Sequence, residues 1–261
     1  MESIIKFMNF MQMSSLNSTR ALGKLVFYAS DAHDCSYLPG QLAVSIFADP
    51  NAEMSVSIYS QLINYGFRRS GEHIYAPQCP SCQACVPLRV PVHDFKPKRH
   101  QRRNLARNAD LSVTARPAEF DPEHFHLYQE YLAKRHTGSS MANPTKAEYL
   151  NFLTSSWSNT VFFEIRDSAK KLLGVIVADK LIYGYSAVYT FYDPDLDDRG
   201  LGKFAILWLI SETRRINLPY VYLGYWIKQC DKMRYKSSYQ PAQIFQNGKW
   251  FNFHQKSILG S

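Results

Sequence analysis

The first third of the chain carries short apolar blocks whose spacing predicts a strand, a helix and two further strands. Residues 41–48 place apolar side chains at every second position, which is typical of a strand with one buried face. Apolar residues at helical spacing then lead to a stop signal at Gly66. Residues 67–75 and 86–92 are predicted as further strands, whereas residues 1–34 show little periodicity and predict a loosely held leader.

From residue 111 onward the pattern predicts a longer series of elements. A strand precedes two helices, three successive strands, an apolar helix, another strand and a hairpin over Asn247-Gly248. The expected ranges are 111–116, 121–135, 146–153, 161–166, 172–181, 185–192, 200–217, 220–225 and 243–253. This is the order of an N-acyltransferase fold of the GNAT type. We therefore predict a mixed α/β (α+β) protein, with a GNAT-like domain at 109–261 and a smaller cysteine-containing N-terminal domain at 1–108.

The strand at 220–225 leads into a segment with a regular basic pattern. Gly224 interrupts an aromatic and β-branched run, which predicts a bulge or a close backbone approach. Lys228, Lys232 and Lys236 then recur every four residues, so a helix would align them in one cationic stripe. The alternative is an aromatic core strand followed by a solvated lysine face.

Composition and charge narrow the class of protein. The chain has 261 residues, of which 46% are hydrophobic and 14% aromatic, enough for sizeable cores. A formal net charge of +8 favours a polyanionic partner, with nucleic acid as the first candidate. No apolar run approaches the roughly 20 residues of a membrane span, and the first 16 residues lack the pattern of a secretion signal. We expect a cytoplasmic protein without membrane contact.

Five cysteines in a chain without an export signal favour thiols or metal ligands over a disulfide framework. Cys79, Cys82 and Cys85 follow a C-x2-C-x2-C spacing, and Cys35 is a candidate fourth ligand of a soft metal ion or cluster. The alternative is a knuckle of small buried thiols without metal. Cys230 stands apart in the sequence and is expected in the core.

A basic segment between residues 96 and 107 is the strongest nucleic-acid signal. It is nearly free of acidic residues, and a helix would give it a broad basic face. The candidate nucleic-acid-binding residues are Lys98, Arg99, Arg102, Arg103 and Arg107. The alternative is an ordinary solvated charged face.

Five separated motifs resemble one known family. They are Gly66-Phe67-Arg68-Arg69-Ser70-Gly71, Cys79-Pro80 with Cys82 and Cys85, residues 101–103 with 107–111, Tyr189-Thr190-Phe191-Tyr192-Asp193-Pro194 and Tyr222-Leu223-Gly224-Tyr225-Trp226-Ile227. In this order they resemble the arginyl-tRNA–protein transferase family, and most of all its bacterial branch of aspartate/glutamate leucyltransferases. The likeness covers about residues 35–253.

The resemblance implies a reaction, its partners and a compartment. Members transfer an amino acid from a charged tRNA to the α-amine of a protein that begins with Asp or Glu, which marks that protein for degradation in the cytoplasm. We expect leucine as the donor, with arginine as the alternative, no cofactor required for the reaction, and a monomer. The cysteines of the eukaryotic branch are linked to iron-sulfur or haem chemistry, but the cysteine spacing here differs.

The chemistry of this reaction requires positioning more than a strong base. An aminoacyl ester is already activated, and an α-amine with a pKa near 7.7–8.0 is partly neutral at cellular pH. Splayed strands ending near Tyr192 and Tyr225 could form the cleft, with these tyrosines as hydrogen-bond donors to the oxyanion and Asp193 as the proton acceptor. The alternative is ordinary strand-end aromatics and a turn acid.

Other basic residues could bind the acceptor's carboxylate or a second anion. Arg135, His136, Lys232 and Lys236 are the candidate substrate-binding residues. Residues 199–203 place glycines at a helix N-terminus, an anion site that holds pyrophosphate in acyl-CoA-dependent relatives. The alternative functions are therefore a CoA-dependent N-acetyltransferase and an RNA-binding module without catalysis.

Overall fold

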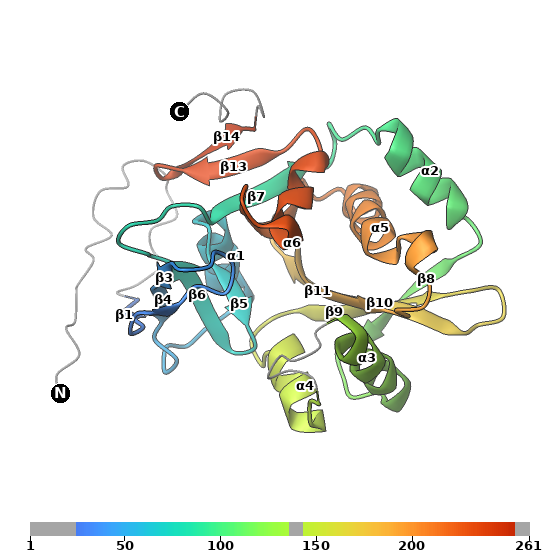
Figure 1. Ribbon diagram of the computed structural model, residues 1–261, viewed down its shortest axis with the longest axis horizontal. Helices are drawn as coiled ribbons and strands as arrows, with labels where there is room; N and C mark the ends of the chain where they lie inside the picture. Colours follow the sequence, from blue (N-terminus) through green and yellow to red (C-terminus); the bar gives the residue numbers. More distant parts are fainter. Residues whose placement is uncertain (1–24, 136–142, 254–261) are drawn as a thin grey trace.

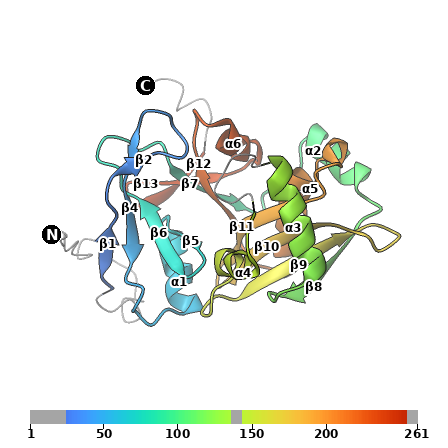
Figure 2. The same ribbon diagram turned by 60° about the horizontal axis from the view of Figure 1, so that its bottom comes forward.

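The computed structural model describes residues 25–135 and 143–253. Its main feature is an eight-stranded sheet in the order β14-β13-β7-β12-β11-β10-β9-β8, beside a four-stranded sheet in the order β1-β4-β6-β5 (Figures 1 and 2). The strands of the large sheet are β7 (Val86–Pro91), β8 (Ser112–Pro117), β9 (Thr160–Arg166), β10 (Leu172–Leu181), β11 (Gly184–Tyr192), β12 (Tyr220–Trp226), β13 (Gln243–Gln246) and β14 (Lys249–Asn252).

Helices cover both faces of the large sheet. Figure 1 shows α5 (Leu201–Arg215) on one face and α3 (Pro122–Arg135) with α4 (Lys146–Leu153) on the other. Buried side chains of α5 pack with β7, β9 and β12 in one apolar core, whereas those of α3 and α4 pack with β10 and β11 in a second core. The burial of apolar surface on both sides explains why β10 is apolar along almost its whole length.

The element order confirms the GNAT-like fold predicted from the sequence. β8 precedes α3 and α4, β9 to β11 form an antiparallel meander, and α5 connects β11 to the parallel strand β12. The hairpin at β13 and β14 turns over Asn247 and Gly248, both with positive φ, as the Asn-Gly pair predicts.

One strand from the N-terminal third lies inside this sheet. β7 pairs antiparallel with β12 on one side and with β13 on the other. The predicted domain boundary near residue 109 therefore does not coincide with an edge of the sheet. Leu88 and Val90 of β7 are 1% and 0% exposed, so the strand contributes to the same core as α5.

β11 and β12 pair for only part of their lengths. Their register runs from Gly184 opposite Tyr220 to Ser186 opposite Tyr222, after which the strands separate. On β12 the register with β7 shifts between Tyr222 and Gly224, which marks a bulge. We call the space between the two strands beyond Ser186 and Tyr222 the β11–β12 gap.

The smaller sheet is built from β1 (Phe27–Ala29), β4 (Ser45–Ala48), β6 (His73–Pro77) and β5 (Arg68–Ser70), and α1 (Val56–Asn64) packs with it. A separate pair joins β2 (His33–Asp34) to β3 (Leu42–Ala43). The single strand predicted at 67–75 is wrong, because Gly71 adopts a φ of 57° and turns the chain into the β5–β6 hairpin. Residues 25–34 of the predicted leader contain β1 and β2.

A buried ion pair joins the two sheets. Arg69 Nε of β5 lies 2.6 Å from Asp179 Oδ2 of β10, and both side chains are fully buried. Tyr59 Oη and Thr160 Oγ1 donate to the same carboxylate at 2.8 and 2.7 Å. Donors from Arg69, Tyr59 and Thr160 therefore stabilise a charge that would otherwise be costly to bury.

The basic segment and the segment after β12 differ in how well the sequence predicted them. α2 (Arg99–Arg107) is the predicted basic helix. The continuous helix expected to carry Lys228, Lys232 and Lys236 is wrong. Lys228 lies in a turn before α6 (Asp231–Arg234), and the 3-10 turn η2 (Tyr235–Ser238) turns Lys236 inward. A second 3-10 turn, η1 (Asp197–Arg199), precedes α5.

Within the described ranges, no helix is both long and apolar enough to cross a membrane.

Candidate active site

The β11–β12 gap is the feature around which the predicted site residues can be located. At the bulge, Gly224 has a φ of 76°, and a Cβ there would lie 3.2 Å from Arg68 Nε and 3.4 Å from its Cζ. A side chain at this position would be strained and would push the guanidinium away. Glycine therefore allows Arg68 of β5 to lie directly against β12.

Tyr225, a predicted hydrogen-bond donor, follows this glycine. Its side chain is 3% exposed, and its hydroxyl donates to the Gly66 carbonyl at 2.9 Å. Burial holds the pKa of this phenol well above its ordinary value. The predicted donation to an oxyanion remains a prediction, and it requires the hydrogen bond to Gly66 to break.

Tyr192 and Asp193 lie at the far end of β11. The Tyr192 ring contacts Tyr131 at 5.0 Å and the Arg135 guanidinium at 5.9 Å between centres. Asp193 Oδ2 accepts from Lys171 Nζ at 2.9 Å, and this ion pair raises the pKa of Lys171. Asp193 thus already accepts a hydrogen bond from a cation, and its role as proton acceptor remains a prediction.

The predicted carboxylate-binding residues are not gathered at one point. Arg135 pairs with Asp197, and Lys232 is exposed on α6. His136 lies outside the described residues. Lys236 is only 7% exposed, and its Nζ donates to the Tyr225 carbonyl at 2.8 Å. Burial and the nearby Arg68 lower the pKa of Lys236 to about 7.

The five predicted tRNA-binding residues lie together on the exposed side of α2 and its N-cap. Gln101, Asn104 and Asn108 occupy the opposite side and are at most 7% exposed. Asn104 Nδ2 donates to the Arg199 and Gly200 carbonyls at 2.9 and 3.2 Å. The amides of Asn104 and Asn108 fix α2 against the start of α5, so its arginines face solvent. The exposed residues are Lys98, Arg99, Arg102, Arg103 and Arg107.

The start of α5 has the glycine geometry expected from residues 199–203. Gly200 is the N-cap, with a φ of 62°. Arg199 Nη2 is held by Asp110 Oδ2 at 2.7 Å, while Lys203 is exposed. The anion-binding role of this helix start remains a prediction.

All five cysteines are free and half-buried. Burial and the fields of the other four cysteines raise the pKa of the Cys85 thiol to about 12. Cys230 is one of those four, and the expectation that it lies in the core is wrong, because it is only half-buried. In the described ranges no group of His, Cys, Asp or Glu is arranged to hold a metal ion. Ligation of a metal ion or cluster by Cys35, Cys79, Cys82 and Cys85 remains a prediction.

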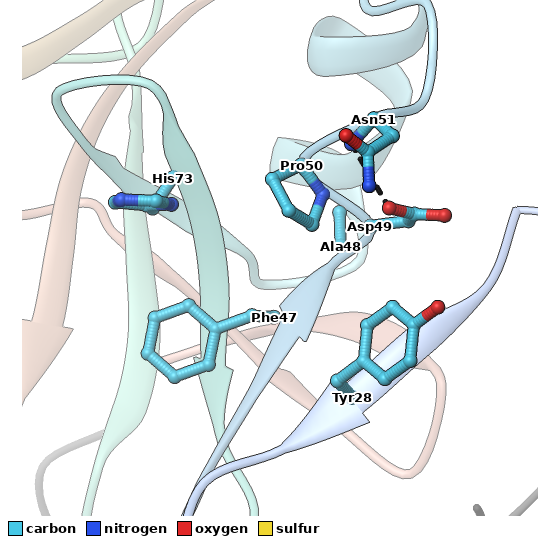
Figure 3. A pocket seen from close by; sticks show the side chains of 7 residues that line it. All are labelled: Tyr28, Phe47, Ala48, Asp49, Pro50, Asn51 and His73. Carbon is cyan, nitrogen blue, oxygen red and sulfur yellow. Dashed lines mark hydrogen bonds between the residues drawn. The ribbon is translucent and has the colours of Figure 1, made fainter.

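A larger pocket lies away from the gap. It has a volume of about 610 Å³ and is lined by residues of β1, β4, the turn after β4 and β6, including Tyr28, Phe47 and His73 (Figure 3). We place the candidate active site at the β11–β12 gap instead, because the gap combines separated strands with two cationic side chains.

Arg68 is the residue of this site that sequence reasoning missed. It was visible only as part of the motif at 66–71, next to Arg69. Two adjacent arginines in a strand point to opposite sides, so at most one of them could share the buried pair with Asp179. This alternation was the available signal.

Comparisons with known proteins give consistent names. A family model described as the N terminus of arginine-tRNA-protein transferase matches residues 33–103, and one for its C terminus matches residues 123–246. The aspartate/glutamate leucyltransferase of Alkalilimnicola ehrlichii is 50% identical over 227 residues, 87% of this chain and 95% of its own. The protein of that name from Teredinibacter turnerae is 48% identical over 238 residues, 91% of this chain and 98% of its own. The solved structure of L-PGS from Bacillus licheniformis has a TM-score of 0.46 and 9% identity, and the match covers 68% of this chain and 64% of that chain.

Proposed function

Because the chain belongs to the arginyl-tRNA–protein transferase family, within the branch of the aspartate/glutamate leucyltransferases, we propose that it transfers leucine from leucyl-tRNA to the α-amine of proteins that begin with Asp or Glu. The observation that carries this proposal is identity near 50% over most of the chain to relatives of that name. The product would carry an N-terminal leucine as a degradation signal.

The reaction moves one aminoacyl group from a ribose oxygen of the tRNA to the α-amine nitrogen of the acceptor protein. The α-amine nitrogen attacks the ester carbonyl, a C–N bond forms, and the ester C–O bond breaks. The ribose oxygen at the 3′ end of the tRNA leaves and receives a proton, while the amine loses one. Asp193 is the proposed first acceptor of the amine's proton, and Tyr192 and Tyr225 are the proposed donors to the oxyanion.

The surface of α2 supports a tRNA partner. Five exposed basic side chains lie on one helix side and its N-cap, and the first turn of the helix contains no acid. Such a surface displaces counterions from a phosphate backbone. Because the Asn104 and Asn108 amides donate to the Arg199 and Gly200 carbonyls, the orientation of the basic side relative to α5 is fixed.

The names of the relatives support neither a CoA-dependent N-acetyltransferase nor a binding module without catalysis. A donor comparison tests this part of the proposal. Purified protein and a peptide that begins with Asp are incubated with leucyl-tRNA, arginyl-tRNA or acetyl-CoA, each with a labelled acyl group. We expect label in the peptide from leucyl-tRNA. Labelling from acetyl-CoA alone would replace the proposal with the acetyltransferase, and labelling from arginyl-tRNA alone would correct the donor.

A further inference from the structure

Arg68 of β5 reaches from the smaller sheet into the β11–β12 gap. Its Nη1 donates to Ser186 Oγ at 2.9 Å, and its Nη2 donates to the Ala187 carbonyl at 2.5 Å. Ser186 is the last residue of β11 paired with β12, and Gly224 of β12 lies against the other side of the guanidinium. Arg68 therefore bridges the two strands at the point where their own hydrogen bonds end.

The charge of Arg68 has no counter-ion in the described part of the chain. Its neighbour Arg69 is paired with Asp179 at 2.6 Å, but no described Asp or Glu forms an ion pair with Arg68. A guanidinium has five N–H donors, and β11 uses two of those on Arg68. Donors therefore remain for a further acceptor.

Lys236 supplies a second cation beside the first. Its Nζ donates to the carbonyl of Tyr225, the residue after Gly224, and to Met233 Sδ at 3.3 Å. Each cation thus contacts one of two successive residues of β12. Among the described residues, no carboxylate forms an ion pair with Lys236 either.

Three ionisable groups near these cations are neutral at pH 7. Tyr75, Tyr225 and the Cys85 thiol all have pKa values raised by burial. They cannot offset the charge of Arg68 or that of Lys236 when it is protonated. Unpaired charges in a largely buried setting are costly, and an anionic ligand would remove that cost.

We propose that Arg68 and Lys236 together form a carboxylate-binding site for the acidic side chain of the acceptor's first residue. This inference rests on the proposed function and names the part of the site that reads the acceptor. A planar guanidinium matches a carboxylate in two parallel hydrogen bonds, and these bonds are strongest when charged. An Asn or Gln side chain has nearly the same shape but no charge, so the site rejects it.

Kinetics of two Arg68 variants test the site. Acceptor peptides that begin with Asp, Glu, Asn or Gln are compared in the wild-type protein, R68M and R68K. We expect R68M to raise KM for acidic peptides at least tenfold with an unchanged KM for leucyl-tRNA, and R68K to recover part of the loss. Unchanged discrimination between acidic and amide peptides in R68M would overturn the proposal. A raised KM for leucyl-tRNA alone would assign the site to an RNA phosphate and would also overturn it.

Leucine transfer by the wild-type protein separates a failure of the proposed function from a failure of the carboxylate site. If it transfers leucine to none of these peptides, the proposed function fails. If it discriminates acids from amides and R68M discriminates equally well, only the carboxylate site fails.

A binding measurement on the wild-type protein does not depend on how R68M folds. Arginine Nε–H resonances are recorded with and without an N-acetylated peptide whose first residue is Asp, or the matched Asn peptide, in the absence of tRNA. We expect the Arg68 resonance, assigned with R68K, to shift with the Asp peptide only. Arg89, enclosed by Tyr220 at 3.7 Å and Trp250 at 4.2 Å, is the internal control and should not shift. No shift at Arg68 would contradict the site.

Discussion

At the scale of single residues, the environment of Lys236 decides its charge. Spacing alone placed it on an exposed stripe with Lys232, because i and i+4 positions share one side of a continuous helix. The short α6 and the tighter turn of η2 instead bury Lys236 against β12 and leave Lys232 in solvent. The sequence could not reveal this difference, since the partner of Lys236 is a backbone carbonyl that any residue could supply.

The buried lysine predicts a pH dependence of stability. Below pH 7 Lys236 is charged in the folded and unfolded states, so the folded state carries the full free-energy cost of burying that charge. Between its folded pKa of about 7 and its ordinary value of 10.5, the unfolded state binds the proton and the folded state does not. The free energy of unfolding therefore rises with pH, by at most about 1.4 kcal/mol per pH unit. Urea unfolding of wild type and K236M from pH 6.5 to 9.5 should show the wild type gaining stability relative to the variant.

Lys232 offers a matched control for this measurement. It is exposed, so the stability difference between wild type and K232M should not change with pH across the same range. A constant difference between wild type and K236M would show that Lys236 keeps its ordinary pKa.

Among the elements, the bounds of strands and helices follow the local sequence pattern closely. Which elements lie next to each other does not follow from that pattern. α4 and β10 begin and end at the expected residues, and α2 lies within the basic segment at 96–107. The place of β7 between β12 and β13 was not predicted, because an apolar strand carries no information on which edge it joins. The same holds for Arg68, whose hydrogen-bond partners on β11 lie 118 and 119 residues away in the sequence.

The α2 surface predicts a salt-dependent loss of tRNA binding. Replacing Arg102, Arg103 and Arg107 by Ala should weaken binding of leucyl-tRNA and lower the slope of log affinity against log salt by roughly two to three. A control triple variant with Ala at Lys180, Arg215 and Lys249, all exposed on other elements, removes the same charge and should keep most of the slope. Equal losses in both variants would mean that net charge, not α2, determines binding.

At the scale of the whole molecule, the two sheets form one working unit. Arg69 and Arg68 leave the same strand of the smaller sheet in opposite directions, one to the buried pair with Asp179 and one to the β11–β12 gap. The GNAT-like order was predictable because each element has its own pattern. The contact of Arg68 from the smaller sheet with the β11–β12 gap was not predictable, because this contact forms only in the tertiary structure.

The place of β7 within the large sheet predicts how fragments behave. A chain of residues 109–261 lacks β7, so the edges of β12 and β13 and the core around Leu88 and Val90 would be exposed. We expect this fragment to show no cooperative unfolding transition by circular dichroism, in contrast to the full chain. A cooperative transition in the fragment would support an independent domain beginning at residue 109.

Leucine transfer with a preference for acidic first residues is tested most directly with labelled leucyl-tRNA and four matched peptides. The peptides differ only in the first residue, which is Asp, Asn, Glu or Gln, so the comparison isolates charge from shape. We expect labelled products from the Asp and Glu peptides and a kcat/KM at least a hundredfold lower for the Asn and Gln peptides, about 2.7 kcal/mol of discrimination. Equal transfer to the acidic and amide peptides, or transfer to none of them, would contradict this expectation.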